Sequence, residues 1–218
     1  GNFSSIKNNV DELSTGSQVL EGSRGAFHGA PITYSKVGYP IYSFFLVDTD
    51  GLFRSQAEID AHTKNGTLIQ PNAQVGDVRY VDYNGDGEIN GEDRQYKGSA
   101  FPKFEYGLRL QGDWKGIDCA IALQGVEGNK IYNGNNQDIA TVRSNINYSA
   151  ATLDSYTFNP NSNFPRLDID DKNNNGADYS DRFLEDGSYL RIKTVQVGYT
   201  FPNSITSQIS IDKCRIYF

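Results

Sequence analysis

A strict two-residue alternation in two neighbouring segments constrains the fold of this chain more than any other feature. Residues 104–111 and 117–124 place an apolar or aromatic side chain at every second position, with polar or small residues between them. These alternating residues are Phe104, Tyr106, Leu108, Leu110, Ile117, Cys119, Ile121 and Leu123. Because successive side chains of a strand point to opposite faces, the pattern predicts two strands joined by a tight hairpin over Gly112–Gly116.

The alternation leaves open what covers the apolar face of this hairpin. In a soluble sandwich the apolar face packs on a second sheet and the polar face meets water. In a transmembrane barrel the apolar face meets lipid and the polar face lines a wet lumen. Both arrangements have the same period, so the alternation alone does not separate them.

Other strands are predicted from weaker signals. One covers Tyr39–Val47, and another covers Tyr189–Tyr199. The apolar face of the second switches between Ile192 and Val195, which predicts a bulge. A weaker strand is predicted within Phe3–Leu13. The fold class indicated by these segments is all-β.

Only one short helix is predicted, over Ser55–Lys64. Ser55 is a suitable N-cap, and Glu58 stands three residues further on, as in a capping box. Near the end of the chain Pro202 is expected to end the preceding strand, because proline cannot donate to a sheet ladder. A last strand is predicted to resume near Ile209.

Between Gly125 and Tyr189 the alternation stops, and the chain is rich in Asn, Asp, Ser and Tyr. Such residues give the backbone local hydrogen-bond partners and favour turns. A short turn followed by a long polar connection is typical of outer-membrane barrels. No apolar run is long enough for a membrane-spanning helix, and the net charge of −7 argues against nucleic acid as a partner.

An acidic segment over residues 82–93 matches the pattern of a calcium loop. Side-chain oxygens stand at loop positions 1, 3, 5 and 12 on Asp82, Asn84, Asp86 and Asp93, and Glu88 would contribute its backbone carbonyl. The segment is similar to dockerin-type loops. We therefore expect Ca²⁺ to bind here as a structural ion; the alternative is an acidic turn without metal.

Two features predict weak calcium binding by this loop. Position 12 is Asp93, whose side chain is shorter than the usual Glu, and the flanking segments do not have the pattern of paired helices. Gly87 at position 6 permits the sharp turn, and Asn90 at position 9 could act through water. The expected dissociation constant is on the order of 10⁻⁴–10⁻³ M.

Several further segments have a recognisable pattern in a fixed order along the chain. They are Gly38–Phe44 with Asp50–Phe53, Gly76–Tyr80 leading into the acidic loop, Pro102–Gly107, Lys115–Asp118 with Gln124–Val126, and Ser180–Lys193 with Gly198–Thr200. In this order they resemble motifs of the SusC/RagA family of TonB-linked outer-membrane proteins. Tyr42 departs from the family pattern, which has glycine there. Both ends of the chain have the character of cut ends, and we expect a fragment of a longer protein without its plug domain.

The resemblance implies late antiparallel strands of a large transmembrane β-barrel, of the roughly 22-stranded type, with long extracellular loops. It implies an outer-membrane, TonB-dependent importer of oligosaccharides or peptides in a Gram-negative bacterium. The implied partners are a SusD-like surface lipoprotein, TonB acting through the plug, a glycan or peptide ligand, and membrane lipid.

Two other functions stay open at this point. The first is a soluble, calcium-stabilised extracellular β domain for binding or adhesion, and the second is a secreted glycosidase. No catalytic arrangement is recognisable: His28 and His62 lie far apart without Ser or Cys partners in known motifs. We therefore expect no enzymatic activity.

Two further sets of residues are assigned structural roles. Cys119 and Cys214 sit at apolar alternation positions, which favours free thiols over a disulfide. A second acidic run fits no metal template and is predicted to be a solvated loop. Its members are Asp168, Asp170, Asp171, Asp178 and Asp181.

Overall fold

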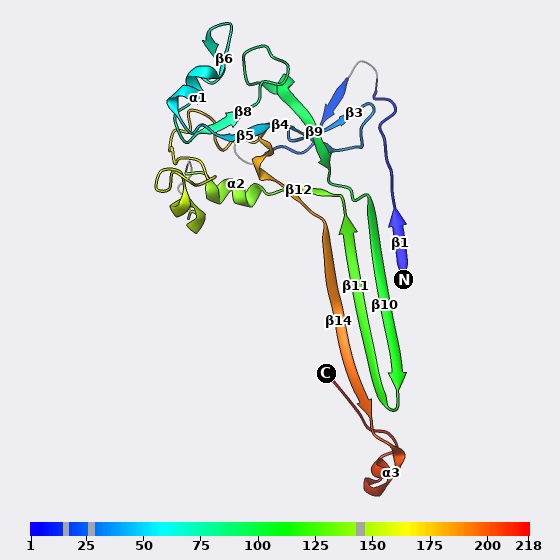
Figure 1. Ribbon diagram of the computed structural model, residues 1–218. Coiled ribbons are helices and arrows are strands. Elements are labelled where there is room, and N and C mark those ends of the chain that lie inside the picture. Colours follow the sequence, from blue (N-terminus) through cyan, green and yellow to red (C-terminus); the bar gives the residue numbers. More distant parts are fainter. Residues whose placement is uncertain (15–17, 26–28, 143–146) are drawn as a thin grey trace. The chain divides into compact units, whose positions relative to one another are not determined.

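The predicted hairpin forms the centre of a five-stranded antiparallel sheet (Figure 1). The computed structural model describes residues 1–14, 18–25, 29–142 and 147–218. The sheet has the order β1-β10-β11-β14-β15. Its strands are β1 (Asn2–Ser5), β10 (Phe104–Trp114), β11 (Ile117–Glu127), β14 (Tyr189–Thr200) and β15 (Arg215–Tyr217).

The hairpin turn is shorter than the five residues predicted from the sequence. The ladder continues to a pair between Trp114 and Ile117, which leaves only Lys115 and Gly116 in the turn. Their φ angles are +50° and +84°. Two left-handed residues match the twist of the flanking strands, so the pairing extends to the end of each strand.

The predicted bulge in β14 is confirmed. Ala122 of β11 pairs with Thr194, whereas the adjacent Leu123 pairs with Ile192. The residue between them, Lys193, is therefore the extra one. The bulge returns Ile192 and Val195 to the same face of the sheet, which explains the switch in the sequence pattern.

The strand predicted near Ile209 is wrong. Residues Asn203–Thr206 form the short helix α3, and Ser207–Ile209 form a 3₁₀ turn. Ser210 then adopts φ +58°, a left-handed conformation that interrupts an extended chain. The last strand, β15, therefore begins only at Arg215.

The chain divides into two compact units. One unit contains the five-stranded sheet and is made of Gly1–Lys7, Phe101–Asn129 and Asp186–Phe218. The other, which we call the insertion unit, is made of Asn8–Ala100 and Lys130–Glu185. The first insertion links β1 to β10 and the second links β11 to β14, so both leave the same end of the sheet.

The insertion unit is built from short strands and helices. Its largest sheet has the order β2-β3-β4-β9, and its other strands form the pairs β5-β8, β6-β7 and β12-β13. The strands are β2 (Val19–Glu21), β3 (Thr33–Lys36), β4 (Ser43–Val47), β5 (Thr49–Leu52), β6 (Thr63–Lys64), β7 (Thr67–Leu68), β8 (Val78–Tyr80), β9 (Arg94–Ser99), β12 (Lys130–Tyr132) and β13 (Leu184–Asp186). The helices are α1 (Gln56–Ala61) and α2 (Gly134–Ala140), with 3₁₀ turns at Gly91–Asp93, Ala150–Asp154 and Asp181–Phe183. Among the described residues no helix has the length and apolar character needed to cross a membrane.

The predicted helix exists but is shorter than the predicted range, because α1 ends at Ala61 and Thr63–Lys64 form β6, and its cap also differs. The Ser55 hydroxyl accepts the N–H of Glu58 at 3.3 Å, as predicted for an N-cap. The Glu58 carboxylate, however, accepts the N–H of Arg54 at 2.7 Å, one residue before the position required by a capping box.

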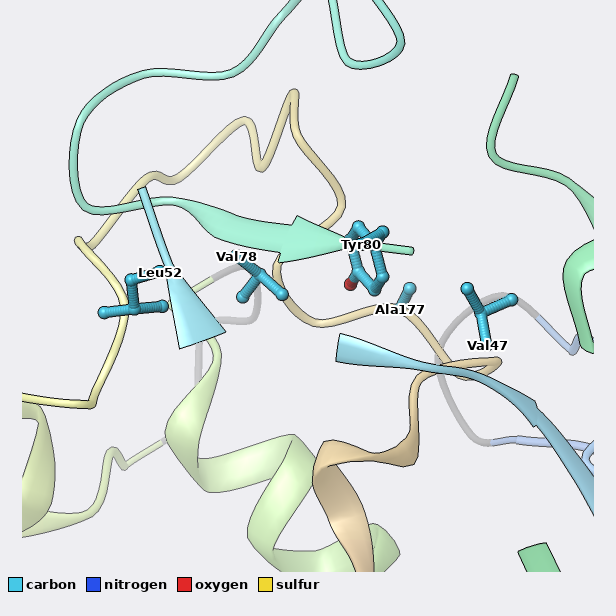
Figure 2. Close-up of a cluster of buried hydrophobic side chains, with 5 residues drawn as sticks. All are labelled: Val47, Leu52, Val78, Tyr80 and Ala177. Carbon is cyan, nitrogen blue, oxygen red and sulfur yellow. The ribbon is translucent and has the colours of Figure 1, made fainter. Parts of the chain in front are cut away.

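Two small apolar clusters form the core of the insertion unit. The first contains Val47, Leu52, Val78, Tyr80 and Ala177, which Figure 2 shows gathered around strand β8. The second contains Ile32, Phe44 and Leu46. Both include residues of β4, in which all five side chains are buried. Because both faces of β4 are covered, its residues from Phe44 to Val47 form a continuous apolar run without alternation.

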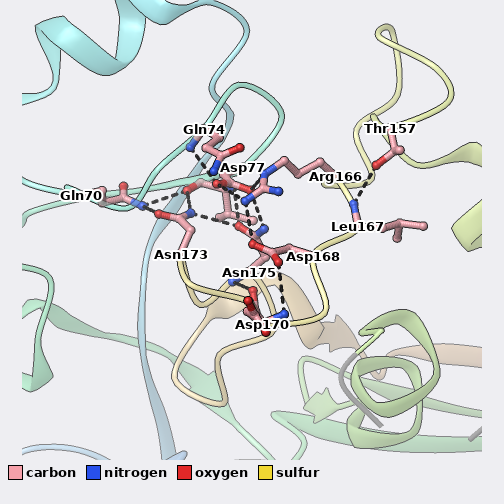
Figure 3. A network of polar contacts seen from close by, with 12 residues as sticks. Gln70, Gln74, Asp77, Thr157, Arg166, Leu167, Asp168, Asp170, Asn173 and Asn175 are labelled. Atoms are coloured by element: carbon pink, nitrogen blue, oxygen red, sulfur yellow. Dashed lines mark hydrogen bonds and ion pairs between the residues drawn. The ribbon is translucent and has the colours of Figure 1, made fainter. Parts of the chain in front are cut away.

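A buried polar network joins the two insertions within this unit (Figure 3). Asp77 of the first insertion pairs with Arg166 of the second, with 2.6 Å between Oδ1 and Nε. Asn175 Nδ2 donates to Asp77 at 2.8 Å, and Asn173 Nδ2 donates to the carbonyl of Val78 at 2.9 Å. The two residues in each of these contacts lie about a hundred positions apart in the sequence. The network therefore holds the two insertions together.

Candidate functional site

The acidic loop connects β8 to β9 and ends in the 3₁₀ turn Gly91–Asp93. Strands flank it on both sides, in agreement with the absence of a paired-helix pattern in the sequence. The carboxylate of Asp82 organises its first half: Oδ1 accepts the N–H of Gly85 at 2.7 Å, and Oδ2 accepts that of Gly87 at 2.9 Å. Gly87 has φ +96°, a conformation that glycine adopts without strain.

Asn84 and Asp86 bind each other in the middle of the loop. Asn84 Nδ2 donates to Asp86 Oδ2 at 2.9 Å, and the N–H of Glu88 donates to Asp86 Oδ1 at 2.8 Å. The hydrogen bond from Asn84, followed by that from Glu88, lowers the pKa of Asp86 below its ordinary value. Asp86 is therefore ionised at neutral pH although no cation side chain pairs with it among these contacts.

Asp93 closes the loop from its last position. It is fully buried, and its two oxygens accept the N–H groups of Tyr83 and Asn90, each at 2.8 Å. Asn90 in turn caps the 3₁₀ turn and accepts the N–H of Glu92 at 2.7 Å. Buried carboxylates need such donors, because an ionised group without them loses its solvation.

The donor set of this loop fits a hard cation, since its side chains offer carboxylate and amide oxygens. The structure places Asp82, Asn84, Asp86 and Asp93 in one loop, but their oxygens accept from backbone N–H groups and, at Asp86 Oδ2, from side-chain amides of the same loop. Within the described residues no three His, Cys, Asp or Glu side chains are arranged to hold a metal ion. The backbone carbonyl of Glu88 was predicted to bind the ion. In the structure the backbone N–H of Glu88 donates to Asp86.

The second acidic run is not the solvated loop that the sequence predicts. Asp171 and Asp178 are buried. Asp171 accepts the N–H groups of Asn175 and Gly176 at 2.6 and 3.0 Å, and Asp178 accepts from Gln137 Nε2 at 2.8 Å. The prediction was wrong because turn N–H groups and a distant amide, which local sequence does not reveal, compensate these carboxylates inside the unit.

The remaining members of that run also have structural partners. Asp181 accepts from the hydroxyl of Thr49 at 2.8 Å, and Asp170 is exposed. Burial opposes ionisation of Asp168, but the N–H of Asp170 and the guanidinium of Arg166 outweigh it, so its pKa lies below the ordinary value.

The structure describes one of the two histidines and both cysteines. His62 ends helix α1, and its burial, followed by the nearby Arg79, lowers its pKa. His28 lies outside the described residues. Cys119 and Cys214 both carry free thiols.

The second candidate for function is the apolar face of the five-stranded sheet. Register brings one apolar residue from each long strand into line: Leu108 pairs with Leu123, which pairs with Ile192. The next line runs through Leu110, Ile121 and Val195. Leu110 is 56% exposed and Ile192 is 64% exposed. Within its own unit this face therefore has no covering layer among the described residues.

Aromatic residues border the apolar face at both ends. At one end Phe3 stacks on Phe104 with ring centroids 5.6 Å apart. At the other end Tyr199 meets Phe201 edge to face at 5.1 Å, and Trp114 is exposed nearby in the ladder. Aromatic rings at both borders of an apolar band are characteristic of strands that cross a membrane.

The opposite face of the sheet is polar. It carries Arg109, Gln111, Asp118, Gln124, Arg191 and Gln196. Arg215 Nε of β15 donates to Asp118 of β11 at 2.9 Å across the one intervening strand, β14. The sequence alternation predicted the two faces of the hairpin. The structure also assigns the two faces of β14, where the bulge interrupts the alternation.

No protein-family model matches the chain. Two proteins of Formosa agariphila, named TonB-dependent receptor P26 and TonB-dependent receptor P3, are 30% identical over 216 residues and 25% identical over 218 residues. Each comparison covers 99% of this chain and 21% of the relative, so the chain spans about a fifth of these proteins.

Solved structures of the RagAB peptide transporter have a similar fold. One structure of the transporter matches with a TM-score of 0.65 at 20% identity, and one of the importer in the open-open state matches with 0.67 at 18%. Both cover 99% of this chain and 22% and 21% of the matched chains. The predicted fold class, antiparallel strands from a large barrel, is confirmed, and in this chain the sheet stays open. The names of these proteins are those of receptors and transporters, which is consistent with the expected absence of enzymatic activity.

Proposed function

We propose that this chain is part of a TonB-dependent importer of the SusC/RagA type in the outer membrane of a Gram-negative bacterium. The observation that carries the proposal is the uncovered apolar face of the five-stranded sheet. Its side chains alternate with a polar face that would line the lumen. The similarity to two named TonB-dependent receptors over nearly the whole chain supports the same function.

The strand lengths suit a membrane crossing. Strands β10 and β11 have 11 residues each and β14 has 12. At about 3.3 Å per residue such strands are roughly 36 Å long, and a tilt of about 45° reduces their height to roughly 25 Å. That height equals the apolar band of outer-membrane barrels.

The soluble-domain alternative requires a second layer over Leu108, Leu110, Ile121 and Leu123. Within the unit that contains this sheet, no such layer exists among the described residues, and a contiguous exposed apolar face is unfavourable in water. In the proposed barrel, the insertion unit would form extracellular loops, because both insertions leave the same end of the sheet. The short Lys115–Gly116 turn at the other end would be periplasmic.

The cargo and partners belong to the same proposal. We infer an imported oligosaccharide or peptide, a SusD-like surface lipoprotein as partner, and energy supplied through TonB. The likeness to the RagAB peptide importer supports this class of assembly.

Spin labels on adjacent residues of the full-length protein test the proposal. Leu110→Cys and Gln111→Cys, in a Cys119→Ala and Cys214→Ala background, would be labelled in outer-membrane vesicles. The Leu110 label should be accessible to oxygen and shielded from a water-soluble nickel chelate, and the Gln111 label should show the reverse. Equal accessibility at both positions would contradict a lipid-facing strand.

We also propose that the acidic loop binds Ca²⁺ weakly as a structural ion. The oxygen-bearing residues at loop positions 1, 3, 5 and 12 and the turn at Gly87 support this. Bound Ca²⁺ would cancel the repulsion among the carboxylates of the loop and hold residues 82–93 more firmly. Limited proteolysis within residues 82–93 should be slower with calcium than with EDTA, and equal rates would refute the proposal.

A further inference from the structure

An open cavity of about 540 Å³ lies within the insertion unit, beside the acidic loop. It is bordered by α1, β5, β6, β8 and the start of the loop. Its polar side chains are Asp50, Glu58, His62, Lys64, Arg79 and Asp82. Cavities of a few hundred Å³ with a small number of placed polar groups are the usual form of small-ligand sites.

Arg79 organises the cavity. Its Nη2 lies 2.6 Å from Asp50 Oδ2, and its Nη1 lies 3.8 Å from Glu58 Oε2. Asp50 and Glu58 remain substantially exposed, with side-chain exposures of 68% and 37%. Free lone pairs on both carboxylates therefore face solvent beside a guanidinium.

Two nitrogen atoms on the same cavity are buried and lack partners among the described residues. They are His62 Nε2 and Arg79 Nε. Burial, followed by the proximity of Arg79, lowers the pKa of His62, so its imidazole is neutral at pH 7. Both atoms are shielded from solvent, so a ligand in the cavity would instead meet the exposed carboxylates of Asp50 and Glu58 and the guanidinium of Arg79.

The charges on the cavity select the ligand class. A carboxylate or phosphate ligand would be opposed by Asp50, Glu58 and Asp82, and a cationic ligand by Lys64 and Arg79. A hydroxyl group is neutral and can donate to a carboxylate while it accepts from a guanidinium or ammonium. Closely paired donors and acceptors of this kind suit adjacent hydroxyls on a sugar ring.

From this geometry we propose that the cavity is a binding subsite for a neutral saccharide unit of the imported ligand. The proposal rests on the importer function and selects the oligosaccharide alternative over the peptide. Asp50, Glu58 and Arg79 bind hydroxyls, and Lys64 and Asp82 border the site. The side chain of Lys64 also packs on the loop, since a Cβ at Gly87 would lie 3.1 Å from its Cβ. The acidic loop therefore shapes one wall of the subsite.

Titration calorimetry on the full-length protein tests the proposal, in a detergent without a sugar headgroup. The probes are linear neutral trisaccharides of glucose, mannose and xylose, with trialanine for comparison. At least one trisaccharide should bind, and Asp50→Asn and Arg79→Lys should each weaken it by roughly tenfold or more. Glu12→Gln, an exposed glutamate outside the cavity, should leave the affinity unchanged.

Three outcomes would overturn the subsite. They are no trisaccharide binding to the unsubstituted protein, binding of trialanine alone, and trisaccharide binding that neither cavity variant weakens. Asp50 is exposed, so its isosteric replacement should fold normally, and thermal unfolding of the variant checks this. The spin-label accessibilities at Leu110 and Gln111 report separately on the importer proposal, so failure of one is distinguishable from failure of the other.

Discussion

At the scale of single residues, Tyr42 combines an unfavourable backbone conformation with a useful side-chain contact. Its φ is +52°, in the left-handed region that disfavours residues with a Cβ. Its ring lies against Gly22, where a Cβ would come within 2.8 Å of Tyr42 Cδ1. The sequence motif around Tyr42 resembles one that has glycine at this position, and the positive φ explains that preference.

Substitutions at Tyr42 should separate these two effects. Tyr42→Gly removes the ring and the strain together, so we expect the free energy of unfolding to change by about 1 kcal/mol or less. Tyr42→Ala removes the ring and keeps the strain, so it should be less stable than the Gly variant by about 1 kcal/mol. Thermal unfolding of both variants measures the difference. An Ala variant as stable as the Gly variant would show that the turn is not strained.

At the scale of secondary-structure elements, the β10–β11 ladder depends on a glycine under an aromatic ring. Tyr106 pairs directly with Gly125, and a Cβ at Gly125 would lie 2.1 Å from Tyr106 Cζ. In the same ladder Gly112 has open space at its Cβ position. The two glycines therefore have different roles in one hairpin.

Gly125→Ala should destabilise the hairpin by about 1–3 kcal/mol, because the ring must move to admit the methyl group. Gly112→Ala is the matched control and should change stability by less than about 0.5 kcal/mol. The temperature at which the full-length protein unfolds in detergent reports both. If Gly125→Ala unfolds at the temperature of the unsubstituted protein, the ring does not occupy that space.

The elements also show which structural features local sequence can predict. Alternation predicted β10 and β11 because each strand has one apolar and one polar face. Even the bulge in β14 left a signal, since the apolar face switched between Ile192 and Val195. The five residues of β4 are buried on both faces, so their run of apolar residues carried no register. The predicted strand at Ile209 was wrong because Asn203–Ile209 form short helical turns that end in the left-handed Ser210, and neither feature is recognisable from composition.

At the scale of the whole molecule, contacts between distant segments determine the insertion unit, and these leave no local pattern. Asp77 and Asn175 are 98 residues apart and bind at 2.8 Å. The acidic run of the second insertion was therefore predicted to be solvated, whereas its buried members hold turns. The acidic loop was located from its spacing, but its hydrogen bonds to backbone N–H groups became visible only in the structure.

The pair between Asp77 and Arg166 should couple the two insertions thermodynamically. Arg166→Met leaves Asp77 fully buried without its cation, and we expect a loss of about 2–4 kcal/mol. The loss should be less than the maximum for a buried pair, because Gln74 N–H and Asn175 still donate to Asp77. Arg24→Met, which removes an exposed ion pair with Glu21 in the same unit, should cost less than about 1 kcal/mol.

The effect of pH distinguishes the ion pair of Arg166 with Asp168 from packing by the Arg166 side chain. The pKa of Asp168 is held below its ordinary value, so its contribution is complete above the ordinary carboxyl range and disappears as pH falls through the lowered value. The difference in stability between Arg166→Met and the unsubstituted protein should therefore be constant from about pH 5 to 8 and shrink below about pH 4. Hydrogen exchange of the full-length protein measures this difference in stability. In the Arg166→Met variant, protection should fall in Asn8–Ala100 and Lys130–Glu185 together. Loss of protection confined to the second insertion would show that the two segments open independently.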